Sequence, residues 1–364
     1  MESLVKFEIK KLKDYYTGKK VFVTGHTGFK GSWLIYWLKQ LGAIVEGYSL
    51  KPEKKSLYDS INGDSIIDNS FFLDINNYDQ IYKKINIFQP DYLFHMAAQP
   101  LVLESYKQPL KTFNTNVIGT ANILNSLLNL NKKCSIIVVT TDKVYENNEL
   151  DRPFKESDQL GGYDPYSSSK AASELVVNSY IKSFFNIKNY NKHQKSISTV
   201  RAGNVIGGGD WSKNRLIPDL VKSFSKNISL EVRSPDSVRP WQHVLEPLAS
   251  YLFIAAKSYN EPQFSRPWNI GPYSNQSLSV RKVVDIANKF WPEGSVSFPS
   301  STTKLHEANI LKLDISDALN ILRWEPKMDI DLTIERTINW YKQFYNGESS
   351  LSLMKKDLDF YINL

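Results

Sequence analysis

A tyrosine and a lysine four residues apart, Tyr166 and Lys170, have the clearest capacity for acid–base chemistry in this chain. The segment that starts at Ser167 and runs to Phe185 has the apolar pattern of a long helix. Residues at i and i+4 project from one face of a helix, so the phenol and the ammonium would lie side by side. The ammonium, together with the charge of a bound cofactor, would lower the pKa of the tyrosine toward neutrality, which predicts a proton shuttle.

This spacing is not specific by itself, because Tyr15 with Lys19 and Tyr16 with Lys20 match it as well. Those two pairs precede the first predicted strand. Only Tyr166 and Lys170 open a helix after the fourth or fifth strand–helix unit, where an active site at a sheet edge requires them. The alternative is a solvated surface pair.

A second polar cluster begins at Thr140, directly after the apolar strand pattern 136–139. Thr141, Asp142 and Lys143 complete it, so a hydroxyl, a carboxylate and an amine follow one another at the carboxyl end of a strand. Doubly wound enzymes bind their ligands at this end of the sheet. The alternative is a helix-capping threonine followed by an exposed Asp–Lys pair.

Three glycines near the N-terminus, Gly25, Gly28 and Gly31, lie between a strand pattern at 21–24 and a helical pattern at 33–41. Glycine lets the backbone turn tightly and lets a diphosphate approach the main chain, and the helix N-terminus supplies N–H donors. This arrangement predicts a dinucleotide site. The alternative is a strand-to-helix turn without a ligand.

The first half of the chain alternates strand and helix patterns, which predicts a doubly wound parallel α/β sheet of the Rossmann type with a smaller C-terminal lobe. Strands are expected at 21–24, 44–49, 70–75, 91–98, 134–141, 197–205 and 268–272, and helices at 33–41, 78–88, 116–130, 167–185 and 245–258. We divide the chain into an N-terminal extension at 1–18, a dinucleotide-binding domain at 19–204 to which 243–272 return, and a substrate-binding lobe at 205–242 and 273–364.

The composition narrows the function class. The net charge of +7, from 45 basic and 38 acidic residues, is spread along the chain, which argues against nucleic-acid binding and favours an anionic small molecule. No apolar run approaches the ~18 residues that span a bilayer, and the N-terminus lacks a signal-peptide pattern, so we expect a cytoplasmic protein. The single cysteine, Cys134, is expected to be a core thiol. No metal site is predicted.

Eight strings together resemble the extended short-chain dehydrogenases that act on nucleotide sugars, and most closely the CDP-glucose 4,6-dehydratase family. They are Thr24-GHTGFKGSW, His95-MAAQPLV, Asn116-VIGT, Thr140-TDKVYEN, Tyr166-SSSK, Arg201-AGNVIGGGDW, Arg215-LIPD and Val238-RPWQHVLEPL. The resemblance runs from about Lys19 to Tyr345, and it implies a nucleotide-sugar substrate, NAD as cofactor and a homodimer packed through the helices after Asn116 and Ser167.

The resemblance also implies a reaction. Tyr166, assisted by Lys170 and Thr141, would remove the C4 hydroxyl proton while the C4 hydride passes to NAD. Lys143 would then remove the C5 proton, Asp142 would protonate the leaving C6 hydroxyl, and the hydride would return to C6. Relatives acting on dTDP-glucose carry Asp-Glu at this point, and Asp-Lys agrees with the CDP-glucose branch.

The binding residues implied by the resemblance fall into two sets. Cofactor contacts are expected from Gly25, Thr27, Gly28, Phe29, Lys30, Gly31, Ser49, Asp74, Ile75, Ala97, Ala98, Gln99, Asn116, Thr140, Tyr166 and Lys170. Substrate contacts are expected from Gln99, Asn204, Trp211, Arg215, Leu216, Arg233, Arg239, Trp241 and His243. A guanidinium grips phosphate oxygens with paired donors, so the two arginines Arg233 and Arg239 are candidates for the pyrophosphate. The two tryptophans would flank sugar or base, or belong to the lobe core.

The end of the second strand leaves the choice of cofactor open on physical grounds. It lacks the acidic residue that usually binds the adenosine ribose. Ser49 can hydrogen-bond the ribose hydroxyls, whereas Lys51 and Lys54 suit a 2′-phosphate. NAD is favoured because a dehydratase regenerates its cofactor in each turnover.

Three alternatives remain at this stage. A nucleotide-sugar 4-epimerase shares Tyr166, Lys170 and the glycine loop, but it has no use for the acid–base pair Asp142-Lys143. A 4,6-dehydratase for another nucleotide sugar, such as UDP-N-acetylglucosamine, also carries Thr-Asp-Lys. A nucleotide-binding scaffold without catalysis would be expected to have lost Tyr166 or Lys170.

Overall fold

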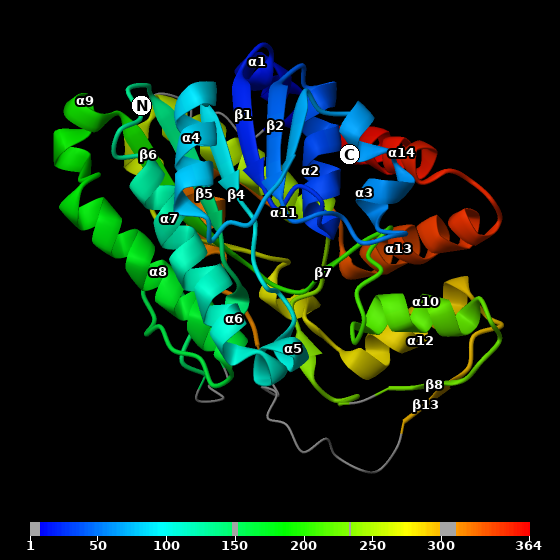
Figure 1. The fold of residues 1–364 in the computed structure, drawn as a ribbon. Helices are drawn as coiled ribbons and strands as arrows, with labels where there is room; N and C mark the ends of the chain where they lie inside the picture. The colour runs from blue at the N-terminus through cyan, green and yellow to red at the C-terminus, as the bar shows by residue number, and fades with distance from the viewer. Residues whose placement is uncertain (1–7, 148–151, 233, 299–310) are drawn as a thin grey trace.

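Parallel strands form the centre of the fold (Figure 1). The computed structural model describes residues 8–147, 152–232, 234–298 and 311–364. Within these residues one sheet has the order β11-β6-β5-β4-β1-β2-β3, and every neighbouring pair in it is parallel. Its strands are β1 (Lys20–Thr24), β2 (Ile44–Ser49), β3 (Asn69–Phe72), β4 (Tyr92–His95), β5 (Cys134–Val139), β6 (Lys195–Ala202) and β11 (Trp268–Ile270). The predicted doubly wound Rossmann sheet is confirmed, with the strand order reversing between β1 and β4.

Helices cover both faces of this sheet, and alternate strand residues face opposite layers (Figure 1). Val21 and Val23 of β1 belong to the cluster on the side of α2 (Phe29–Gln40) and α11 (Leu245–Asn260). Phe22 belongs to the cluster on the other side, which is formed with α4 (Tyr78–Phe88), α7 (Gly119–Ser126) and α8 (Pro165–Ser183). Because both faces are covered, strands such as β5 are buried along their whole length.

Several predicted strands end earlier in the structure than the sequence pattern suggested. The strand expected at 70–75 ends at Phe72, the one at 91–98 ends at His95, and the one at 134–141 ends at Val139. The helix expected at 116–130 begins as a π-helical turn at Asn114–Ile118 before α7. In each strand the extra residues form the loop at the carboxyl end of the sheet, and these loops build the site.

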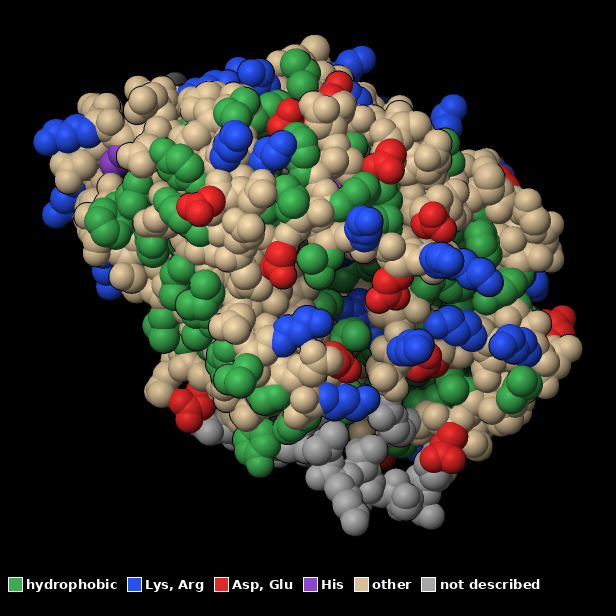
Figure 2. All heavy atoms as spheres, in the orientation of Figure 1, with side chains coloured by type: hydrophobic (Ala, Val, Ile, Leu, Met, Phe, Trp, Pro, Cys, Tyr) green, Lys and Arg blue, Asp and Glu red, His purple; other side chains and the backbone are tan. Residues whose placement is uncertain are grey.

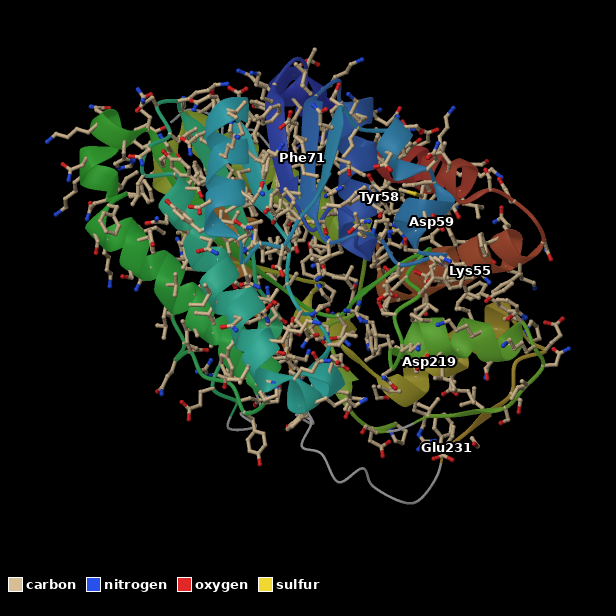
Figure 3. The ribbon with its side chains drawn as sticks, in the orientation of Figure 1. Lys55, Tyr58, Asp59, Phe71, Asp219 and Glu231 are labelled. Carbon is tan, nitrogen blue, oxygen red and sulfur yellow. The ribbon has the colours of Figure 1, made fainter. Side chains whose placement is uncertain are left out.

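The C-terminal part of the chain adds helices and two-stranded pairs beside this edge of the sheet (Figure 3, where Asp219 marks α10 and Glu231 marks β8). Its helices are α10 (Leu216–Phe224), α12 (Val280–Phe290), α13 (Ile330–Tyr345) and α14 (Ser350–Asn363). The pairs are β7 (Val205–Ile206) with β10 (Gln242–His243), β9 (Val238–Arg239) with β12 (Leu278–Ser279), and β8 (Leu230–Glu231) with β13 (Val296–Ser297). Shorter helices are α1 (Leu12–Tyr16), α3 (Leu57–Ser60), α5 (Val102–Lys107), α6 (Pro109–Phe113) and α9 (Tyr190–His193).

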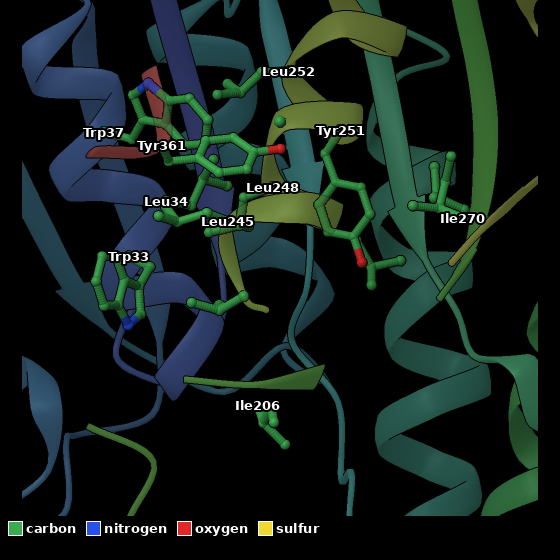
Figure 4. Packing of buried hydrophobic residues seen from close by; sticks show 14 of the residues in the cluster. Trp33, Leu34, Trp37, Ile206, Leu245, Leu248, Tyr251, Leu252, Ile270 and Tyr361 are labelled. Carbon is green, nitrogen blue, oxygen red and sulfur yellow. The ribbon is translucent and has the colours of Figure 1, made fainter. Parts of the chain in front are cut away.

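Helices α1 and α14 both pack beside the sheet near α11, and Figure 4 shows Tyr361 of α14 next to Trp37. The ring of Tyr361 in α14 lies 5.9 Å from that of Trp37 in α2, and its hydroxyl donates to Glu246 Oε2 at 2.8 Å. The hydroxyl of Tyr16 in α1 donates to the carbonyl of Leu252 at 2.8 Å. Division of the chain at residue 204 stays a prediction, and these contacts tie the residues outside 19–204 closely to the sheet.

Cys134 is buried and forms no disulfide, as expected for a core thiol. Over the described parts of the chain, every helix is too short or too polar to cross a membrane.

Candidate active site

The segment after β5 presents Thr141, Asp142 and Lys143 at the carboxyl edge of the sheet. Thr141 caps a short 3-10 turn at Asp142–Val144, and its Oγ1 accepts a hydrogen bond from the Lys143 N–H at 3.4 Å. The same hydroxyl donates to Asp142 Oδ1 at 2.9 Å. It is also hydrogen-bonded to the side chain of Tyr166. The structure therefore joins the two polar clusters that the sequence placed 25 positions apart.

Helix α8 delivers Tyr166 and Lys170 to this loop. Asp164 caps the helix by accepting hydrogen bonds from the N–H of Ser167 at 3.0 Å and from its hydroxyl at 2.6 Å. Lys170 Nζ donates to the carbonyl of Val139, the last residue of β5, at 3.0 Å. Both side chains are buried, so the pair is not the solvated surface pair that spacing alone allowed.

Burial dominates the protonation equilibria of this pair. It raises the pKa of Tyr166 to about 12, while the hydrogen bond with Thr141 and the charge of Arg215 oppose that rise. It lowers the pKa of Lys170 to about 8, with Glu174 opposing. Among the protein groups, desolvation of the phenolate therefore outweighs the charges around Tyr166. The lowered pKa expected with the charge of a bound cofactor stays a prediction.

Asp142 and Lys143 form an ion pair at the edge of a pocket. Lys143 Nζ lies 3.3 Å from Asp142 Oδ1, and the side chains are 23% and 1% exposed. Asp142 Oδ2 is buried without a hydrogen-bond partner among the described residues. An exposed Asp–Lys pair, the alternative left open by the sequence, is excluded by this burial.

The pocket beside Lys143 is lined by residues from both parts of the chain, and Figure 2 shows a hollow between these parts with basic and acidic side chains at its rim. Its lining comprises Val102, Lys143, Tyr145, Asn147, Gly162, Tyr163, Asp164, Ser167, Arg239 and Leu311. Arg239 and Lys143 thus line the same pocket, and the contact of Arg239 with an anionic substrate stays a prediction.

The glycine loop has no room for a side chain at Gly25 or Gly31, because the neighbouring backbone lies too close. Gly25 has a φ of +74°, and a Cβ on it would lie 2.7 Å from the backbone nitrogen of Ala97. A Cβ on Gly31 would overlap the carbonyl of Gly25. Gly28, the N-cap residue of α2, provides no side-chain cap to the first N–H groups of the helix. These residues fit a dinucleotide diphosphate.

The other predicted cofactor residues lie along the same edge of the sheet. Thr27 Oγ1 and Ser49 Oγ are 2.8 Å apart, Gln99 N–H donates to Asn116 Oδ1 at 2.8 Å, and Ala97 N–H donates to Thr24 Oγ1 at 3.2 Å. Phe29 begins α2, Ala98 follows β4, and Asp74 and Ile75 follow β3. Thr140 differs, because its hydroxyl is occupied by the buried Glu174 at 2.6 Å.

The side chain of Lys30 extends from the glycine loop to helix α11. Its Nζ lies 3.4 Å from the hydroxyl of Tyr251 in α11. Burial, together with the charges of Lys170 and Arg215, lowers the pKa of Lys30 to about 7, and Asp142 opposes this shift. Tyr251 was missed by the sequence analysis, because a single tyrosine inside an apolar helix is indistinguishable from a core residue.

Apart from Gln99 and Arg239, which are described above, and Arg233, the predicted substrate residues fall into three groups. In the first group, the Asn204 carbonyl accepts from the Gln242 N–H at 2.9 Å and Leu216 begins α10. Arg215 pairs with Asp210 at 3.0 Å, and its charge lowers the pKa of Tyr166 and of Lys30. Trp211 packs its ring against Tyr341 and Phe344, each at 5.2 Å. Arg233 lies outside the described residues.

Trp241 and His243 form the third group, which the structure does not bring to the pocket. Trp241 is 5% exposed and donates its indole N–H to the carbonyl of Leu278 at 3.0 Å. His243 is fully buried, accepts at Nδ1 from the Leu245 N–H at 3.3 Å, and lies 4.0 Å from Asp357. Neither residue is among those that line the pocket around Lys143, and their contact with the substrate stays a prediction.

Comparison with known proteins agrees with this geometry. The profile of the family described as GDP-mannose 4,6 dehydratase matches residues 22–337. The CDP-glucose 4,6-dehydratase of Salmonella typhimurium is 42% identical over 353 residues, which cover 96% of this chain and 98% of that protein. The UDP-glucose 4-epimerase of Mycoplasma genitalium is 26% identical, covering 76% and 83%. Among solved structures, the dTDP-glucose 4,6-dehydratase of Streptomyces venezuelae with NAD and TYD bound superposes with a TM-score of 0.74 at 21% identity, over 91% of this chain and 99% of that one.

Proposed function

Because this chain belongs to the GDP-mannose 4,6-dehydratase family, we propose that it is an NAD-dependent hydro-lyase that converts CDP-D-glucose to CDP-4-dehydro-6-deoxy-D-glucose. The observation that carries the reaction is the buried Asp142–Lys143 pair beside Tyr166. The identity of 42% with a CDP-glucose 4,6-dehydratase supports the choice of nucleotide sugar.

Oxidation at C4 rests on Tyr166. Its phenolate oxygen takes the proton of the C4 hydroxyl, and the hydroxyl of Thr141 hydrogen-bonds the phenol and so orients it. Lys170, anchored on the Val139 carbonyl, supplies positive charge beneath the site. NAD supplies the hydride acceptor for C4 and the hydride donor for C6.

Loss of water rests on Asp142 and Lys143. In an ion pair the carboxyl is deprotonated and the amine is protonated, whereas loss of water requires the reverse. The base must be a neutral amine to take the C5 proton, and the acid must be a protonated carboxyl to donate to the leaving C6 hydroxyl. Transfer of one proton across the 3.3 Å contact between Lys143 Nζ and Asp142 Oδ1 produces both states at once.

A 4-epimerase is the second candidate, because a UDP-glucose 4-epimerase is among the relatives at 26% identity. An epimerase also uses the tyrosine and the lysine of α8, but it loses no water. The buried acid–base pair favours the dehydratase.

NAD is the cofactor we propose for the glycine loop. Ser49 replaces the usual acidic residue at the end of β2, and its hydroxyl already contacts Thr27. Lys55, labelled with Tyr58 and Asp59 in Figure 3, donates its backbone N–H to the Asp59 carboxylate at 2.9 Å. We expect calorimetry to give a lower Kd for NAD than for NADP. Tighter binding of NADP would show that Lys51 and Lys54 select a 2′-phosphate.

We further expect a homodimer formed through α6, α7 and α8. These helices pack side by side (Figure 1), and apolar side chains on and around them are exposed: Leu110 by 79%, Leu175 by 58% and Ile118 by 50%. Figure 2 shows hydrophobic side chains gathered on this side of the molecule. An unpartnered apolar face of this kind is typical of an interface, and sedimentation of the wild-type protein tests it. The single buried cysteine agrees with the reducing environment of the cytoplasm, where we expect the enzyme to act.

One assay separates the candidates. Purified protein with NAD is incubated with CDP-, UDP-, dTDP- and GDP-linked glucose and with GDP-mannose, and the 4-keto-6-deoxy product is measured by its absorbance in alkali. We expect product from CDP-glucose at the highest kcat/KM. An epimerised sugar without loss of water would contradict the dehydratase, and preference for another nucleotide would contradict CDP-glucose.

A further inference from the structure

A buried ion pair outside the pocket connects the two segments that carry the proposed chemistry. Arg201 in β6 grips Glu174 in α8 with two hydrogen bonds, Nε to Oε1 and Nη2 to Oε2, both 3.0 Å long. Each side chain is 3% exposed. Paired bonds of this kind hold both partners in one orientation.

Glu174 belongs to the same helix face as the catalytic pair. Tyr166, Lys170 and Glu174 follow one another at intervals of four residues along α8, so their side chains form one row. Arg201 therefore fixes the position of Glu174 in this row, while Tyr166 and Lys170 point toward the end of β5.

The loop after β5 is attached to the same ion pair at both of its ends. At the start, Thr140 Oγ1 donates to Glu174 Oε1 at 2.6 Å. At the end, the hydroxyl of Tyr145 accepts a hydrogen bond from Arg201 Nη1 at 2.9 Å and donates to Asn269 Oδ1 in β11 at 2.6 Å. Thr141, Asp142 and Lys143 lie between these two attachments.

We propose that Glu174, Arg201 and Tyr145 are positioning residues that hold Asp142 and Lys143 in register with Tyr166, so that C4 oxidation and loss of water occur on one bound sugar. The proposal rests on the proposed dehydratase function. Glu174 and Arg201 are not among the residues that line the pocket around Lys143, and Tyr145 borders that pocket beside Lys143. Their effect is carried by the backbone of the loop, and the Tyr145 attachment is two residues from Lys143.

This arrangement predicts a separation of the two chemical steps. In Tyr145→Phe the ring keeps its stacking on Phe154, at a centroid distance of 5.0 Å and an interplanar angle of 6°, but Arg201 and Asn269 lose the hydroxyl between them. The row on α8 keeps its own attachment through Glu174. The Asp142–Lys143 end of the loop is therefore released, while Tyr166 and Lys170 stay in place.

The experiment is a single turnover with enzyme in excess over CDP-glucose, in which reduced nicotinamide absorbance and 4-keto-6-deoxy product are followed together. For Tyr145→Phe we expect C4 oxidation within about 3-fold of the wild type and loss of water slowed by at least ~10-fold, within the ~10²-fold that a misplacement of about 1 Å can cost. Reduced nicotinamide should then accumulate transiently. Arg201→Lys, which keeps the charge but loses the paired donors to Glu174 as well as the bond to Tyr145, should slow both steps.

Two further readouts do not depend on turnover. The Kd for NAD, measured by calorimetry, should stay close to wild type for Tyr145→Phe. The thermal unfolding midpoint should fall, because Arg201 Nη1 and Asn269 Oδ1 lose the buried hydroxyl between them. The matched control is Tyr16→Phe, which also removes one buried hydroxyl, here bonded to Leu252 away from the site; it should change neither step.

Equal slowing of both steps in Tyr145→Phe would overturn the proposal in favour of a general structural role, and so would unchanged kinetics. If the wild type makes no dehydrated product from any of the nucleotide sugars, the proposed function fails first, and the positioning role fails with it.

Discussion

Tyr166→Phe is expected to abolish oxidation at C4 and to lower turnover by at least ~10²-fold, the low end of the contribution of a general base. The ring remains in its buried position, but the atom that takes the C4 hydroxyl proton is gone. The hydrogen bond between this side chain and Thr141 is lost as well. No reduced nicotinamide should form when the variant is mixed with NAD and CDP-glucose.

The control for this variant is Tyr92→Phe, at the amino end of β4. The Tyr92 hydroxyl donates to the carbonyl of Tyr15 at 3.3 Å, on the opposite edge of the sheet from the site. Turnover of this control should stay near wild type. Near-normal turnover of Tyr166→Phe would move the proton acceptor elsewhere, and Tyr251 next to Lys30 would be the first residue to test.

Lys143→Met is expected to stop the reaction one step later. Tyr166, Thr141 and Lys170 keep their contacts, so C4 is still oxidised, but no amine remains to take the C5 proton. Reduced nicotinamide should accumulate on the enzyme with substrate present, and 4-keto-6-deoxy product should be absent. Both variants should lack product, but only Lys143→Met should show the absorbance of reduced nicotinamide.

Lys143→Arg should fail in the same way, because a guanidinium stays protonated and cannot act as a base. The control is Lys188→Met, which removes an exposed lysine beyond the end of α8. Normal turnover of Lys143→Met would reduce this lysine to a neighbour of Asp142. Glu146, whose carboxylate accepts from Gln159 Nε2 at 2.6 Å, would then be the next base to test.

The sequence by itself determined those features of this protein that depend on neighbours along the chain. Alternating strand and helix patterns specified a parallel sheet, because periodicity is a local property. The glycine loop between 25 and 31, the Tyr166–Lys170 spacing and the adjacency of Asp142 and Lys143 are local in the same sense.

Tertiary structure decided what depends on residues far apart in the chain. Whether Asp142–Lys143 was an exposed pair or a buried one, and whether Trp241 and His243 reached the pocket or the core, depended on which elements cover them. The direction of the Tyr166 pKa shift was decided in the same way, because desolvation is set by the surrounding fold and here exceeds the effect of nearby charge. The contacts of Tyr145 with Arg201 and Asn269 span 56 and 124 positions, so no local pattern signals them. Folding alone brings these groups together, since the carboxyl ends of parallel strands meet at one edge of the sheet.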